Sequence, residues 1–174
     1  MDDVLASPRD EGPVRLIVRR TGRGQREILA VGELDPGVGL VGDDWVKRPS
    51  KSTGQPSPYA QLTVMNARFA ELIAEDAAAG AWAQAGDQLY VDLDLSQENL
   101  PAGTRLAVGS AIIEISAEPH TGCAQFSARF GADAMRFANS ERGRALRLRG
   151  ANAVVVRPGV VRMGDPARRI PAGA

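Results

Sequence analysis

The chain has 174 residues, of which 44% are hydrophobic and 24% are charged, and its 21 basic and 21 acidic side chains cancel. This composition is that of a folded globular protein, and the length suffices for a core without disulfides or metal ions. Because the net charge is zero, the chain lacks the field on which nonspecific nucleic-acid binding depends, and we expect no nucleic-acid partner.

The cysteine and histidine content limits the chemistry further. The sequence contains one cysteine, Cys123, and one histidine, His120. These two residues cannot supply the three or four protein ligands of a zinc site, and a single cysteine cannot form an internal disulfide. The N-terminus is acidic and polar, unlike a signal peptide, and no apolar run approaches the ~20 residues that cross a bilayer. We therefore expect a cytoplasmic protein without a membrane partner.

The first third of the chain predicts a hairpin followed by irregular segments. Strand patterns at 14–19 and 26–31 flank a Gly-containing turn. Residues 37–45 are rich in glycine and end in an acidic pair, and this pattern favours a turn. Residues 46–60 contain three prolines and three serines, which predicts a long exposed loop. Loops of this length often act as lids or contact ligands.

A short strand at 61–65 is followed by a helix pattern at 67–79. Asn66 is placed to cap this helix, and Gly80 ends the pattern.

The strongest strand signal lies at 87–96, where leucine and valine alternate with Tyr90, Asp92 and Asp94. The alternation predicts one face in the core and one face in water. Two carboxylates on a wet face can hold a cation, but such pairs are more often simply solvated.

Short strands continue at 104–108 and 111–116, and the chain closes with a predicted hairpin of 152–156 and 160–163. Many short strands with few long helices predict a mainly β, α+β fold with a closed or nearly closed antiparallel β-barrel. The expected organisation is a flexible tail at 1–12, a single barrel domain at 13–165 and a second tail at 166–174.

The stretch 118–131 is the strongest candidate for a functional site. A turn containing His120 follows a strand and leads to Cys123, after which Phe126 and Phe130 are spaced for one face of a helix. A thiol at a helix N-terminus has a lowered pKa and is more nucleophilic. A free cysteine is also often buried and inert, and the spacing alone does not separate these two interpretations.

Basic residues follow this stretch. Arginines are clustered at 142–149, with one more just before them, and such a cluster can bind phosphate or carboxylate oxygens. A solvated basic face is the alternative. The members are Arg136, Arg142, Arg144, Arg147 and Arg149.

Several segments together resemble the MOSC domain, a module related to the C-terminal part of molybdenum cofactor sulfurases. The resemblance spans about residues 14–165. It is carried, in chain order, by Gly39-Leu40-Val41-Gly42-Asp43, Gly86-Asp87-Gln88-Leu89, Asp92-Leu93, Asn99-Leu100-Pro101, Gly103, Gly109, the 119–123 loop, Phe126, Gly131, Arg149-Gly150, Pro158-Gly159 and Gly164-Asp165.

The resemblance implies a barrel in which a cysteine carries sulfur or ligates molybdenum, and this cysteine falls on Cys123. His120 would hold the thiolate or shuttle a proton, since its ordinary pKa lies near neutrality. The remaining candidates are the residues that would line the cleft or bind an anionic pterin phosphate. They are Gly42, Asp43, Asn99, Thr121, Gly122, Arg129, Arg136 and Arg142.

The leading functional hypothesis is a stand-alone sulfur carrier or molybdenum-cofactor-binding protein. A cysteine desulfurase or a molybdoenzyme would then be its partner, and pyridoxal phosphate would be bound only by a separate partner protein. A molybdenum-cofactor-dependent oxidoreductase with Cys123 as metal ligand is a variant of this hypothesis. The alternative is a non-catalytic barrel that binds a small anionic ligand or a protein partner, with Cys123 structural.

Overall fold

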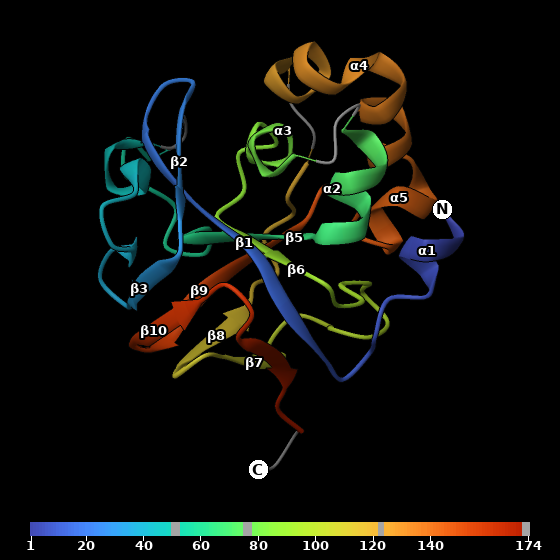
Figure 1. Cartoon of the computed structure of the whole chain (residues 1–174). Coiled ribbons are helices and arrows are strands. Elements are labelled where there is room, and N and C mark those ends of the chain that lie inside the picture. The colour runs from blue at the N-terminus through green and yellow to red at the C-terminus, as the bar shows by residue number, and fades with distance from the viewer. Residues whose placement is uncertain (50–52, 75–77, 122–123, 172–174) are drawn as a thin grey trace.

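A closed barrel forms the centre of the molecule (Figure 1). The computed structural model describes residues 1–49, 53–74, 78–121 and 124–171. Within these ranges seven strands close a ring in the order β11-β7-β8-β9-β5-β6-β1, because β11 also pairs with β1. The predicted mainly β, α+β barrel is confirmed. The strands are β1 (Glu11–Gly22), β5 (Leu62–Asn66), β6 (Leu89–Val91), β7 (Arg105–Val108), β8 (Ala111–Ile115), β9 (Ala151–Arg157) and β11 (Pro166–Arg169).

The pairing departs from the sequence prediction at two places. Strands β5 and β6 are parallel, whereas the other strand pairs of the described barrel are antiparallel. The predicted C-terminal hairpin is wrong, since β10 (Gly159–Arg162) pairs with β3 (Val31–Asp35). The reason is that both edges of β9 are already occupied, by β5 and by β8. Strand β4 (Gly39–Leu40) completes this second sheet, and β2 (Gln25–Leu29) forms the predicted hairpin with β1.

Parts of both predicted tails belong to helices and strands of the fold. Helix α1 (Asp2–Leu5) buries Val4, and β1 begins at Glu11. Strand β11 pairs with both β1 and β7. The four residues of β11 include two arginines and show no alternating hydrophobic pattern. This strand therefore forms because it pairs with strands that are distant in the sequence.

Five α-helices occur in the described residues, and Figure 1 shows α2, α4 and α5 together on one side of the barrel. The predicted cap of α2 is confirmed, since Asn66 Oδ1 accepts a hydrogen bond from Phe69 N at 3.0 Å. This helix ends at Ile73, well before the predicted residue 79, because Ala74 is extended. The helices are α2 (Ala67–Ile73), α3 (Ala79–Ala83), α4 (Ala124–Asn139) and α5 (Glu141–Ala145), and a 3₁₀ turn spans Asp44–Lys47.

Helix α4 contains a break at Gly131, whose φ is +86°. The helix predicted to carry Phe126 and Phe130 is therefore followed, after this glycine, by a second helical piece. No helix in the described ranges is long and apolar enough to span a membrane.

Two buried clusters share the strands between them. One fills the barrel and contains Leu89 and Val91, and the other lies between the barrel and the helices and contains Tyr90. Tyr90 is fully buried, and its hydroxyl donates to Trp82 O at 2.8 Å. The prediction that Tyr90 faces water was wrong, because helices cover the outer face of β6. Asp92 is paired with Arg68 at 2.6 Å.

The Asn66 side chain connects three elements, and its removal tests this packing. Its amide nitrogen donates to Leu93 O at 2.8 Å and to Ser7 Oγ at 2.9 Å, in addition to the helix cap. We predict that Asn66→Ala lowers the free energy of unfolding by about 2–4 kcal/mol, since it removes a cap and leaves buried groups unpaired. Denaturant unfolding measures this change.

The matched control is Ser140→Ala. Ser140 caps α5 through Gly143 N at 3.0 Å and is only partly buried. This substitution should cost about 1 kcal/mol. Equal losses in the two variants would contradict the bridging role of Asn66.

Candidate functional site

The candidate site begins where the chain leaves β8. Residues 116–121 form a loop that is anchored to its own start and to β9. Ser116 Oγ accepts from Glu118 N at 3.2 Å, and Asn152 Nδ2 donates to Glu118 O at 3.1 Å. These contacts fix the path of the chain up to His120 and Thr121. Gly122 and Cys123, which follow, lie outside the described residues.

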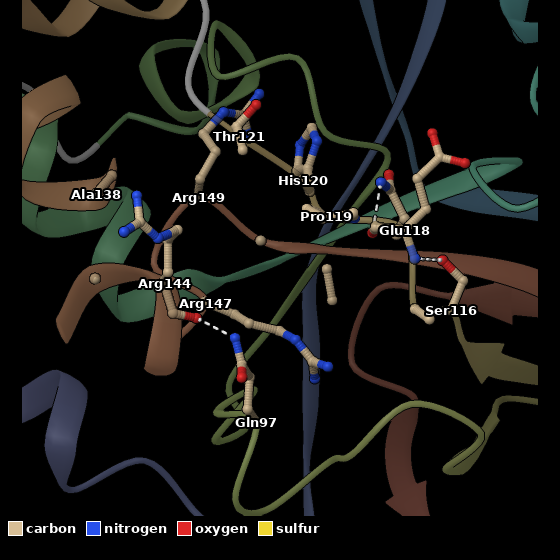
Figure 2. A pocket seen from close by; sticks show the side chains of 15 residues that line it. Gln97, Ser116, Glu118, Pro119, His120, Thr121, Ala138, Arg144, Arg147 and Arg149 are labelled. Atoms are coloured by element: carbon tan, nitrogen blue, oxygen red, sulfur yellow. Dashed lines mark hydrogen bonds between the residues drawn. The ribbon is translucent and has the colours of Figure 1, made fainter. Parts of the chain in front are cut away.

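This loop forms one wall of a cavity of about 210 Å³. Figure 2 shows the side chains of Arg144, Arg147 and Arg149 on one side and those of Glu118 and Ser116 on the other. The arginines come from α5 and the segment that joins it to β9. The cavity lining includes His120, Arg144, Arg147, Arg149 and Asn152.

A second hollow of about 320 Å³ adjoins the first. Both are lined by the loop residues from Glu118 to Thr121 and by Asn152. The second hollow is also lined by Trp45, by Arg20 and by Ser57, which donates a short hydrogen bond to Glu118. The long loop predicted at 46–60 therefore contributes to the wall of this second hollow. We call the two hollows together the cleft.

A buried, hydrogen-bonded chain of three ionisable side chains underlies the cleft. His120 Nε2 lies 3.0 Å from Asp87 Oδ1, and Arg149 Nη1 donates to Asp87 Oδ2 at 2.6 Å. Arg149 Nη2 also donates to Ala85 O at 3.0 Å. The side chain of Asp87 is fully buried, that of Arg149 is 7% exposed and that of His120 is 18% exposed. His120 is thus the member of this chain that is most accessible from the cleft.

The electrostatics of the three groups follow from this arrangement. Burial acts to raise the pKa of Asp87, but the charge of Arg149 and the contact with His120 outweigh it, and the pKa is lowered. For His120 the direction of the burial effect is opposite: burial lowers its pKa, and the charge of Arg149 lowers it further. The contact with Asp87 offsets these two effects only partly. Asp87 is therefore an anion and His120 a neutral imidazole at neutral pH.

Gly150 allows the close approach of these groups. Its φ is +109°, and a Cβ atom there would lie 2.6 Å from Val64 O, 3.2 Å from His120 Cδ2 and 3.3 Å from Asp87 Oδ1. A side chain at this position would strain the backbone and displace the strand behind the site.

Arg149 also packs against the predicted aromatic pair. Its guanidinium lies 4.9 Å from the ring centroid of Phe126, and the centroid of the tilted Phe130 ring lies 5.0 Å from that of Phe126. The prediction that both rings share one helix face is confirmed. Arg149 Nε is buried and has no hydrogen-bond partner among the described residues.

Among the predicted site residues, His120 and Thr121 line the cleft, and the three predicted arginines do not. Arg129 donates to Gln84 O and lines a different hollow. Arg136 forms an exposed ion pair with Asp133, and Arg142 is exposed on α5. Arg144 lines the cavity and Arg142 does not, although the two residues belong to the same cluster.

The predicted residues that precede the 118–131 stretch lie outside the cleft lining. Asp43 is fully buried and pairs with Arg20 at 2.7 Å, just behind the second hollow. Gly42, with φ +81°, precedes it. Asn99 is buried and bonds the backbone of Arg9 and Asp94 at 2.8 Å. These positions stabilise the loops around the barrel.

Asp87 was not among the predicted site residues, although it belongs to the segment Gly86-Asp87-Gln88-Leu89 that carries part of the resemblance. Its signal was an acidic residue directly before a strongly apolar strand, where a carboxylate is buried and needs a partner. In the described part of the chain no group of three or more His, Cys, Asp or Glu side chains is placed to hold a metal ion.

Comparison with known proteins places the fold. No protein-family model and no curated protein matches the sequence. Among solved structures, the YUAD protein from Bacillus subtilis superposes with a TM-score of 0.67 at 16% identity, covering 90% of this chain and 94% of its own. YiiM from Escherichia coli gives 0.58 at 18% identity, with 94% and 71% coverage. YiiM from Geobacillus stearothermophilus gives 0.55 at 14% identity, with 97% and 76% coverage. These neighbours are MOSC-type barrels, and the chain therefore has a MOSC-like barrel fold.

Proposed function

We propose that this MOSC-like domain binds the molybdenum cofactor in the cleft and uses Cys123 to receive sulfane sulfur or to ligate the metal. One observation carries the proposal: three arginine residues and His120 line one cavity, beside the loop that leads to the only cysteine. A cluster of this kind favours an anionic ligand.

The residues of the cleft fit the molybdenum cofactor as an anionic ligand. Arginine side chains bind phosphate oxygens in pairs, and Arg149 Nε is a buried donor without a partner among the described residues. Arg147 donates to Leu95 O and Leu100 O, which holds its side chain at the cavity wall. The adjoining second hollow provides space for a ligand larger than the first cavity. When bound, the cofactor supplies a redox-active metal that soft thiolates ligate well.

In the sulfur-carrier form of the proposal, the chemistry belongs to Cys123. Its thiolate attacks the terminal sulfur of a persulfide on a cysteine desulfurase and becomes a persulfide itself, while the desulfurase leaves as a thiolate. The sulfur then passes to an acceptor by the same exchange. Arginine side chains around the cleft favour the anionic sulfur species over the thiol.

The second candidate function is a non-catalytic barrel that binds a small anion. It is favoured by the same cationic lining and requires no reactive thiol. The two functions differ in the reactivity of Cys123, so native-state thiol titration separates them.

The sulfur-carrier form predicts a change in the mass of the protein. Anaerobic incubation with a cysteine desulfurase and cysteine should add about 32 Da, the mass of one sulfur atom, to the intact protein. Because the chain has a single cysteine, Cys123→Ser should abolish the adduct completely. Intact-protein mass spectrometry measures both. A wild-type protein that gains no mass, and whose thiol reacts slowly in the native state, would rule out the sulfur-carrier form.

Cofactor binding predicts a loss of metal when the cationic wall is changed. Arg144→Glu should lower the molybdenum content of protein made in a cofactor-producing host by about tenfold or more, because one charge-assisted contact is worth about 1.5–3 kcal/mol. Arg142→Glu makes the same charge change two residues away, at a position that does not line the cavity, and should retain the wild-type content. Metal analysis of the purified proteins tests both. Equal losses would mean that overall charge, and not the cavity, governs binding.

A further inference from the structure

We infer that Asp87 and Arg149 are positioning residues that hold His120 as the neutral tautomer with its proton on Nε2, so that Nδ1 is the proton acceptor of the cleft. The inference deepens the proposed function and rests on it only in taking the cleft as the reactive centre. It stands on the geometry of three side chains from three separate segments, those before β6, after β8 and before β9.

The charge of Asp87 sets the direction of its hydrogen bond with His120. Asp87 is buried and ionised, so both of its oxygens accept hydrogen bonds. Oδ2 accepts from Arg149, and Oδ1 lies 3.0 Å from His120 Nε2. Nε2 must therefore carry the proton, and a neutral imidazole then has its lone pair on Nδ1.

The charge of Asp87 also bears on the protonation state of His120. A fully buried carboxylate needs a compensating cation. Arg149, at 2.6 Å, is that cation, so His120 does not have to be protonated in order to neutralise Asp87. Without the arginine, the carboxylate would favour an imidazolium ion at neutral pH, and Nδ1 would be a donor.

The bond to Asp87 also sets how His120 responds to a proton. When Nδ1 takes a proton from an O–H, N–H or S–H group of a bound ligand, the ligand is left with the electron pair and becomes an anion. The imidazolium that forms keeps its Nε2–H bond to Asp87, which stabilises the new charge. The ligand anion lies beside the arginines of the cavity wall.

Other charged groups surround His120 and act on the same equilibrium. Glu118 belongs to its own loop, Arg20 comes from β1, and Arg48 and Arg144 line the two hollows. Only Asp87 and Arg149 form the described hydrogen-bonded chain beneath the ring. Substitutions at these two residues therefore separate the inferred role from the general field of the cleft.

The test uses the fact that His120 is the only histidine. Long-range ¹H–¹⁵N spectra of the full chain show one imidazole, and we expect Nε2 to be protonated and Nδ1 to be unprotonated at pH 7. The titration midpoint should lie below the ordinary value of about 6.5. An Nδ1–H tautomer or a midpoint above that value would overturn the inference.

Two variants should move this signature in different ways. In Asp87→Asn the amide group can donate to Nε2, so the proton should move to Nδ1. In Arg149→Met the unneutralised carboxylate should raise the pKa of His120 by about one unit or more. Arg149→Lys keeps the cation and should leave the pKa near the wild-type value. It is the variant to measure if Arg149→Met does not fold.

The control is Asp92→Asn, which removes another aspartate paired with an arginine, 2.6 Å from Arg68 and away from His120. It should leave both the tautomer and the pKa unchanged. If Asp87→Asn behaves like Asp92→Asn, the buried pair is structural only and the inference fails. These spectra need neither sulfur nor molybdenum, so failure of the sulfur and metal experiments would disprove the proposed function separately.

Discussion

The buried carboxylate of Asp87 is the constraint on which the candidate site depends. It lies directly before β6, inside the protein, and its charge is stable only because Arg149 and His120 reach it from other segments. Arg149 fixes the chain between α5 and β9, and His120 fixes the loop after β8. One charged group thus connects the barrel strand to both walls of the cleft. Gly150 provides the space in which these groups meet.

The same strand shows how the barrel and the site are joined. Leu89 and Val91 point into the barrel, while Tyr90 points outward under the helices. The outer face of β6 therefore belongs to a second core, to which α2, α3 and α4 also contribute. Phe126 of α4 reaches from this second core to the guanidinium of Arg149. The helices that cover the barrel also support the cationic wall of the cleft.

The arginines of the 136–149 cluster lie in different surroundings, because each occupies a different position on α4, on α5 or in the segment that follows. Arg142 and Arg144 are two residues apart on the same helix, and only Arg144 lines the cavity. Arg149 is buried beneath the cleft, and Arg136 forms an ion pair with Asp133 on the surface. A basic sequence cluster therefore yields one cavity wall and one solvated face, so both interpretations of the cluster apply to different members of it.

By itself, the sequence determined the elements whose information is local. The first hairpin, the Asn66 cap, the break in α4 at Gly131 and the loop that carries His120 follow from turn residues, capping and periodicity. Tertiary structure decided the rest. It paired β10 with β3 and β11 with β1, it covered Tyr90 with helices, and it brought Asp87 to His120 and Arg149. The physical reason is that strand edges, helix cover and charge compensation depend on partners distant in the chain, and one sequence without its fold does not specify which partners meet.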